Sequence, residues 1–137
     1  MSYLIETNCL SELRRRTPNP NVAQWFSKRP SRAMYLSVLS LGEIRKSAES
    51  AKDASQRASL LDWLELELPA FYRNRLLAID EAVADQWGRL FATAGRPLPV
   101  IDGLLAATAL VHRLTIVTRN VKDFEGLGVQ VLNPWLA

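Results

Sequence analysis

DGLLAATALVHRLTIVTRNVKD, residues 102–123, is the segment that says most about the architecture of this chain. Residues 102–113 read as a helix whose small side chains Ala106, Ala107 and Ala109 permit close contact with a neighbouring element. Leu114–Val117 then forms a short apolar run of strand length, and polar residues follow at once. A helix that leads straight into a buried strand is typical of a βαβ unit, in which the strands are parallel.

The rest of the chain repeats this alternation. The other predicted strands are Tyr3–Ile5, Met34–Val38, Leu76–Ile79 and Val129–Leu132. Helices are predicted for Cys9–Arg16, Asn21–Arg29 and Ser55–Pro69, and from Ser40 and Asp80 onward. Because right-handed crossovers place helices on both faces of a parallel sheet, we expect an α/β fold. The predicted form is a three-layer α/β/α sandwich with a central, mainly parallel sheet of about five strands, and residues 1–137 form a single domain.

Four acidic positions lie beside predicted strand ends or helix starts: Glu6, Glu43, Asp102 and the Asn120–Asp123 pair. In parallel sheets, ligands gather at the carboxyl ends of the strands, so these positions can meet there. Carboxylates that meet raise one another's pKa and are usually neutralised by a divalent cation. The sequence therefore predicts a metal-dependent enzyme. The alternative for Glu43 is a capping box with Ser40, and Asp80 is predicted to cap a helix.

Composition narrows the kind of metal and substrate. Cys9 is the only cysteine and His112 the only histidine, which excludes a disulfide and a soft zinc site. We expect Cys9 to be a small buried side chain and His112 to lie on the surface. The net charge of +3 comes mostly from arginine and suits a polyanionic substrate. Basic residues near the acids are the candidate phosphate contacts: Arg14, Arg15, Arg45, Lys46, Arg119 and Lys122.

No apolar run is long enough for a membrane span, and the start of the chain has no signal-peptide pattern, so a cytoplasmic location without a membrane partner is expected.

Four blocks of the sequence together resemble the PIN-domain ribonucleases, specifically the VapC-type toxins of toxin–antitoxin pairs and their FitB-like relatives. The blocks are LIETNCLSEL (4–13), SVLSLGEIRKSAE (37–49), IDGLLAATALVHRLTIVTRNVKDF (101–124) and VQVLNPW (129–135). The resemblance implies a Mg²⁺- or Mn²⁺-dependent endoribonuclease that a cognate antitoxin inhibits. It implies an RNA substrate, frequently tRNA, a homodimer, and contact with operator DNA only through the antitoxin. The amphipathic segments 19–29 and 55–68 are candidates for the protein contacts, and burial within the same chain explains them equally well.

The resemblance also assigns roles by position. Catalytic acids would be Glu6, Glu43, Asp102 and Asp123, with Glu6 and Asp102 holding the metal. The supporting polar residues would be Thr7, Asn8, Thr118 and Asn120. Tying down the turn through their own hydrogen bonds is an equally good role for Thr7 and Asn8.

Two positions depart from the family pattern. Glu6 stands where the family has Asp, and its extra methylene moves the carboxylate by roughly 1 to 1.5 Å. Since Mg²⁺ requires near-ideal geometry, this predicts reduced activity. Glu6 is either a natural variant to which the site adjusts or a deliberate replacement of Asp in a toxic protein. Asn120 occupies a slot where many relatives have Asp, and Asp123 is the alternative source of that charge.

Two other functions compete with the nuclease. A non-catalytic RNA-binding module with a degenerate acidic site is compatible with Glu6 and Asn120. A Mg²⁺-dependent phosphoacceptor receiver domain is suggested by Asp80 after the third strand and Thr118 after the fourth. That class, however, has paired acids after the first strand, and here there is only one. Dinucleotide binding is disfavoured because no G-x-G-x-x-G follows a strand.

Overall fold

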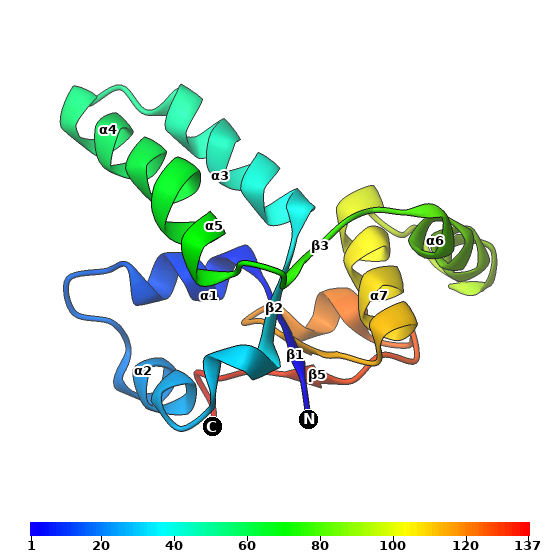
Figure 1. Cartoon of the computed structure of the whole chain (residues 1–137). Coiled ribbons are helices and arrows are strands. Elements are labelled where there is room, and N and C mark those ends of the chain that lie inside the picture. Colours follow the sequence, from blue (N-terminus) through cyan, green and yellow to red (C-terminus); the bar gives the residue numbers. More distant parts are fainter.

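A five-stranded parallel sheet forms the centre of the computed structural model, which describes all residues 1–137 (Figure 1). The strands are β1 (Tyr3–Ile5), β2 (Met34–Ser37), β3 (Leu76–Leu77), β4 (Thr115–Val117) and β5 (Val131–Leu132). Their order is β3-β2-β1-β4-β5, and every neighbouring pair is parallel. The predicted parallel sheet of five strands is confirmed, with strands one to two residues shorter than expected for all but β1.

Helices connect these strands. They are α1 (Thr7–Leu13), α2 (Pro20–Ser27), α3 (Val38–Ser50), α4 (Ala54–Asp62), α5 (Leu68–Phe71), α6 (Glu81–Thr93) and α7 (Val100–His112). Short 3₁₀ helices occupy η1 (Ser31–Ala33) and η3 (Val121–Phe124). The predicted helix 55–69 is instead α4, a π-helical turn η2 (Trp63–Glu67) and α5. The irregular turn precedes Pro69, which has no N–H to continue the α-helical hydrogen bonds.

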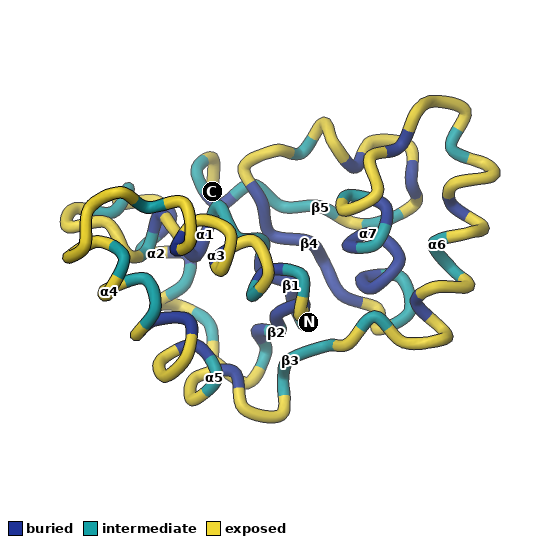
Figure 2. Tube along the Cα trace, turned by 90° about the horizontal axis from the view of Figure 1, so that it is seen from above, coloured by how far each residue is buried: buried dark blue, intermediate teal, exposed yellow.

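The sheet separates two apolar cores, which confirms the three-layer arrangement (Figure 2). Tyr3 and Ile5 of β1 face the first core, where they meet side chains of α1, α2, α3 and α5. Leu4 between them faces the second core with side chains of α6 and α7. This alternation follows from the two-residue period of a strand. Burial on both faces explains why β1 is a continuous apolar run and why β4 has no polar residue except Thr115.

Several helices begin one to three residues earlier than predicted, and α1 and α7 start at Thr7 and Val100. The side chain of Asp80 accepts a hydrogen bond from the N–H of Val83, so it caps α6 as expected. The capping box of Ser40 with Glu43 is wrong. Because β2 ends at Ser37, that residue caps α3 by accepting from the N–H of Leu39, 3.1 Å away. Glu43 lies beyond the first turn, and its side chain is not used as a cap.

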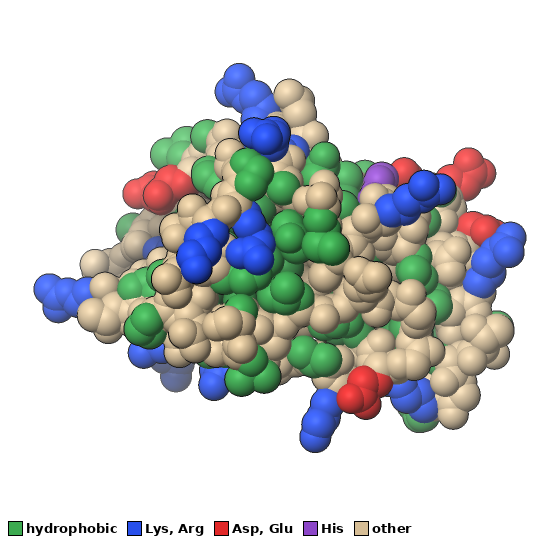
Figure 3. All heavy atoms as spheres, turned by 90° about the horizontal axis from the view of Figure 1, so that it is seen from below, with side chains coloured by type: hydrophobic (Ala, Val, Ile, Leu, Met, Phe, Trp, Pro, Cys, Tyr) green, Lys and Arg blue, Asp and Glu red, His purple; other side chains and the backbone are tan.

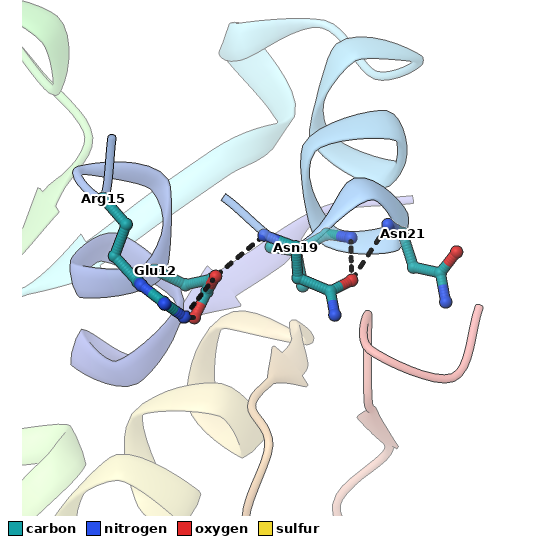
Figure 4. A network of polar contacts seen from close by, with 5 residues as sticks. Glu12, Arg15, Asn19 and Asn21 are labelled. Carbon is teal, nitrogen blue, oxygen red and sulfur yellow. Dashed lines mark hydrogen bonds and ion pairs between the residues drawn. The ribbon is translucent and has the colours of Figure 1, made fainter. Parts of the chain in front are cut away.

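Glu12 joins α1 to α2 through the network shown in Figure 4. Its buried carboxylate accepts a hydrogen bond from the backbone N–H of Asn19 at 2.8 Å and contacts Arg15 at 3.3 Å. The Asn19 bond, followed by Arg15, holds the pKa of Glu12 below its ordinary value of 4.5. Asn19 in turn caps α2 by accepting from the N–H of Asn21, which fixes the turn that follows α1.

The face at the amino ends of the strands carries scattered Lys and Arg side chains and few acidic ones (Figure 3). Glu6 and Thr118, which belong to the predicted site, follow β1 and β4 at the opposite, carboxyl ends of the strands. No helix of this structure is long and apolar enough to span a membrane.

Candidate active site

Glu6 is the first residue beyond β1, at the carboxyl edge of the sheet. Its backbone N–H donates to the carbonyl of Val117 on β4 at 3.0 Å, and its extended backbone precedes α1. The helices α1, α3 and α7 all begin near the predicted acids, at Thr7, Val38 and Val100. Helix N-termini carry partial positive charge, so this edge also favours anionic ligands.

A triangle of hydrogen bonds orients the Glu6 carboxylate. Asn8 donates from Nδ2 to Glu6 Oε2 at 3.1 Å and to Thr118 Oγ1 at 3.0 Å. Thr118 Oγ1 also accepts from the backbone N–H of Asn120 at 3.0 Å. With both of these donors pointing at it, the Thr118 hydroxyl directs its own proton to Glu6 Oε2. One carboxylate oxygen is therefore held by the protein, and Oε1, which has no hydrogen bond, is left for another ligand.

Contacts to its side-chain oxygen also fix Asn8. Its Oδ1 accepts from the backbone N–H of Arg119 at 3.2 Å, and the thiol of Cys9 lies 3.3 Å away. Cys9 is fully buried, and burial raises the pKa of its thiol, so it is a neutral donor beneath the site. The expectation of a small packed side chain is confirmed. The contact with Asn8 adds a role that sequence reasoning missed.

Glu43 enters from α3. Thr7, the first residue of α1, donates its hydroxyl proton to Glu43 Oε1 at 2.9 Å. This bond links two helices that are 36 residues apart in sequence and holds an exposed carboxylate on the edge next to Glu6.

Asp102 lies in the first turn of α7, two residues later than the helix start, and Asp123 lies on η3. The pKa of the Asp102 carboxyl is raised from 3.8, first by burial and then by the charges of Asp123 and Glu43. The pKa of Glu6 is raised from 4.5, first by burial; Thr118 and Asn8 oppose this, and Asp102 and Glu43 add to it. Asp102 therefore lies within electrostatic reach of the other three acids, and Glu43 within reach of both Glu6 and Asp102.

The ligand type fits a hard cation such as Mg²⁺ or Mn²⁺, because the converging groups are carboxylate oxygens. Their mutual repulsion is the kind that a divalent cation relieves. No three His, Cys, Asp or Glu side chains approach closely enough to hold one ion together. Mg²⁺ is commonly bound by one or two carboxylates with water and substrate phosphate, so two carboxylates suffice as direct ligands.

The predicted basic residues have different surroundings. Arg14 donates to Ser59 and covers the ring of Trp63, while Arg15 pairs with Glu12. Of the other four, two contact other side chains and two form no ion pair. Arg45 pairs with Glu65 and Glu49, Arg119 lies over the ring of Trp135, and Lys46 and Lys122 are exposed without an ion pair.

Asn120 and Arg96 complete the surroundings. The backbone N–H of Asn120 donates to Thr118, but the Asn120 side chain forms no capping hydrogen bond with η3. The structure therefore shows no contact between this side chain and the acids. Arg96 donates to the backbone carbonyls of Asp123 and Glu125 at 3.0 and 3.1 Å and lowers the pKa of Asp102. Sequence reasoning missed Arg96 because it follows a glycine in a loop, with no periodic pattern to place it.

Known proteins are similar in sequence to this chain along most of its length. A family description, PIN domain, matches residues 3–128. Plasmid stability protein StbB of Pseudomonas syringae pv. tomato is 33% identical, over 98% of this chain and 99% of StbB. Toxin FitB of Neisseria gonorrhoeae is 32% identical over 96% and 97% of the two chains. VapC ribonuclease Y4jK of Sinorhizobium fredii is 29% identical over 96% of each.

Solved structures agree with the sequence matches. The crystal structure of FitAcB from Neisseria gonorrhoeae superposes with a TM-score of 0.90 at 31% identity, covering 98% of this chain and 99% of the other. FitAB bound to an IR36 DNA fragment gives a TM-score of 0.88 at 30% identity, covering 97% and 95%. This chain therefore shares its architecture with the matched chains of both solved structures along nearly the whole length.

Proposed function

The chain belongs to the PIN domain family, and on this basis we propose that it is a metal-dependent endoribonuclease toxin of a toxin–antitoxin pair. The observation that carries the proposal is the Glu6 carboxylate, which Asn8 and Thr118 hold through one oxygen. It lies at an edge where Asp102 and Glu43 contribute to raising its pKa, and where Asp123 and Glu43 contribute to raising the pKa of Asp102. A relative named as a VapC ribonuclease supports RNA as substrate.

In the proposed mechanism, Glu6 and Asp102 hold a Mg²⁺ or Mn²⁺ ion. When bound, the ion polarises a phosphoryl oxygen and lowers the pKa of a water. Asn8 and Thr118 keep Oε1 of Glu6 directed outward, and Thr7 keeps Glu43 beside it. Glu43 and Asp123 orient the attacking water and accept its proton.

No side-chain nucleophile is needed. His112 is exposed at the end of α7, on the side of the molecule away from Glu6, and Cys9 is buried. Neither of these side chains is placed to attack a phosphate. Hydrolysis by a water molecule is therefore the chemistry that the surrounding carboxylates support.

The extra methylene of Glu6 is proposed to attenuate cleavage. It places the carboxylate farther from the backbone than an Asp carboxylate would lie, and Mg²⁺ tolerates little displacement of its ligands. Burial, and then the charges of Asp102 and Glu43, raise the pKa of this carboxyl. Withdrawing the group by roughly 1 to 1.5 Å in a Glu6→Asp variant should raise the cleavage rate. An equal or lower rate would show instead that the site is adjusted to Glu6.

Cleavage of total RNA with and without EDTA tests the proposal. In Mn²⁺, the wild-type protein should release defined fragments, and EDTA or Asp102→Asn should abolish them. Asp85→Asn is the matched control, because Asp85 is an exposed carboxylate on α6 that pairs with Arg89. Fragments that persist in EDTA, or that Asp102→Asn leaves unchanged, would refute a metal-dependent nuclease centred on Asp102.

A cognate antitoxin is the proposed inhibitor, and the chain is proposed to form a homodimer and to act in the cytoplasm. A partly apolar groove of about 320 Å³ between α1 and η2–α5 supports an antitoxin site; its lining includes Leu13, Trp63 and Phe71. The groove overlaps the predicted segment 55–68. FitAB has been solved bound to a DNA fragment, which supports DNA binding by the assembled pair, and contact with operator DNA through the antitoxin is part of the proposal. Co-expression with the product of the neighbouring gene should suppress RNA cleavage.

The structure bears on one of the two competing functions, and an experiment distinguishes the other. A receiver domain does not fit, because Asp80 follows the edge strand β3 and its side chain caps α6. A receiver would need that carboxylate free for phosphorylation. The RNA-binding module without catalysis is distinguished by the EDTA experiment, since it predicts binding without fragments.

A further inference from the structure

A cavity of about 780 Å³ opens beside the carboxylates, between α3 and the start of α7. One wall is a stripe along α3 with four-residue spacing, formed by Val38, Gly42, Lys46 and Ser50. Residues with this spacing lie on one face of a helix. Ile101 of α7 lines the cavity as well. The volume is within the range of about 300–1,000 Å³ for pockets that hold small organic ligands.

The cavity is continuous with the proposed active site. Thr7 and Glu43, which are hydrogen-bonded to each other, are among its lining residues. A group that occupies it therefore lies directly beside the edge where the phosphodiester is proposed to be cut.

The lining combines apolar and cationic character. Val38 and Ile101 are exposed to 37% and 39%. Lys46 forms no ion pair within the chain. Exposed apolar side chains suit the face of a base, and an unpaired ammonium suits a phosphate or a base carbonyl.

Gly42 keeps this wall open. A methyl group built at Gly42 would meet no atom within 4 Å, so the rest of the chain does not require a glycine there. Glycine inside a helix costs about 1 kcal/mol relative to alanine. Gly88 on α6 is equally open but lines none of the described cavities, and it therefore provides a control.

We propose that this cavity binds the base and ribose of one nucleotide next to the cut phosphate and so sets the base preference of cleavage at that position. The proposal rests on the proposed ribonuclease function and adds the subsite. Val38 and Ile101 contact the base, Lys46 contacts the adjoining phosphate, and Gly42 leaves the space that the nucleotide fills. A nucleotide is favoured over a second protein chain for two reasons. The cavity adjoins the acids that are proposed to hold the metal ion, and the unpaired ammonium of Lys46 lines it.

Filling the cavity tests the proposal. Sequencing of RNA ends from wild-type digests should show a base preference at one position beside the cut, and Gly42→Leu should remove or change it. With a fixed oligonucleotide, Gly42→Leu should raise KM by about tenfold or more, the equivalent of one good contact. Gly88→Leu, the same change on an equally open helical glycine, should keep both the preference and KM. Lys46→Gln should weaken binding of all sequences and reduce the salt slope by about one.

A binding measurement without catalysis separates the two proposals. In EDTA, titration with nucleoside monophosphates should shift the backbone amide NMR signals of Gly42 and Ser50, and Gly42→Leu should abolish the shifts. Shifts without RNA cleavage by any variant would support nucleotide binding in the cavity while refuting the nuclease. Cleavage with unchanged base preference in Gly42→Leu, and no shifts, would overturn the subsite alone. Loss of a wild-type dimer in Gly42→Leu, with no nucleotide shifts, would assign this face to a second copy and also overturn it.

Discussion

Thr118 is a small side chain on which the orientation of Glu6 depends. It is fully buried and accepts hydrogen bonds from Asn8 and from the backbone of Asn120, so its proton has one acceptor, Glu6 Oε2. The Thr118 hydroxyl is fixed by the backbone that follows β4, and it in turn fixes the Glu6 carboxylate that follows β1.

Thr118→Val keeps the shape of this residue and removes its hydroxyl. We expect RNA cleavage to fall by about 10- to 100-fold, the usual effect of removing a group that orients a metal ligand. Thr118→Ser restores the hydroxyl and should recover most of the rate. Thr115→Val, the same change on β4 where the hydroxyl contacts Gln130, should leave cleavage unchanged. Full activity of Thr118→Val would show that this hydroxyl does not position Glu6.

Glu6 also links the site to stability. Its pKa in the folded protein is raised above 4.5 by burial and by neighbouring acids, so the folded state holds its proton more tightly than the unfolded chain. The free energy of unfolding therefore falls as pH rises from 4.5 through the raised value.

Glu6→Gln removes this titration. In EDTA at neutral pH, the variant should have a higher Tm than the wild type, and the decline of Tm above pH 4.5 should be weaker, while RNA cleavage is lost. Glu67→Gln changes an exposed acid on η2 and should keep the wild-type pH dependence. The measurement is thermal unfolding followed by circular dichroism at several pH values, and identical profiles for wild type and Glu6→Gln would contradict it.

The pair α6 and α7 holds Asp102 in place through a close contact at Gly103. A methyl group at Gly103 would lie 3.0 Å from the indole of Trp87 and 3.1 Å from Leu98. Because Gly103 directly follows Asp102, any displacement of α7 also moves a proposed metal ligand.

Gly103→Ala is therefore expected to destabilise the protein by about 1–3 kcal/mol, as overfilled cores do. Cleavage should fall with it. Gly88→Ala on the same helix pair meets no neighbour and should be neutral or stabilising by up to about 1 kcal/mol. Denaturant unfolding of the two variants compares these effects directly. A Gly103→Ala protein as stable as the wild type would show that α6 can move away without loss.

The existence of the buried strands and of the longer helices was predictable from the sequence, whereas the residues at which they begin and end were not. The apolar runs 3–5 and 114–117 identify β1 and β4, because strands buried on both faces carry no polar alternation. The start of α3 was misplaced because Ser37 and Ser40 are equally good caps by residue type, and only the end of β2 selects Ser37. The π-helical turn before Pro69 was missed because the helical spacing of Leu60, Leu64 and Leu68 continues through it, and only the missing N–H of Pro69 hints at the irregularity.

At the scale of the whole molecule, the order of the strands in the sheet brings the site residues together. Since β1 pairs with β4, residues 6 and 118 are neighbours at one edge although 112 positions separate them, and the bond from Thr118 to Glu6 follows. Sequence reasoning placed both residues at that edge, because parallel strands share their carboxyl ends. It did not find the Thr7–Glu43 bond or Arg96, which depend on how α3 and the loop before α7 approach the sheet.

Anomalous diffraction from crystals soaked in Mn²⁺ tests most directly whether these acids form a metal site. We expect one strong anomalous peak within bonding distance of a Glu6 oxygen and an Asp102 oxygen, and we expect it to be absent from Asp102→Asn crystals treated in the same way. No peak at this edge in the wild type, or a peak that remains in Asp102→Asn, would contradict the proposal that Glu6 and Asp102 together hold the catalytic ion.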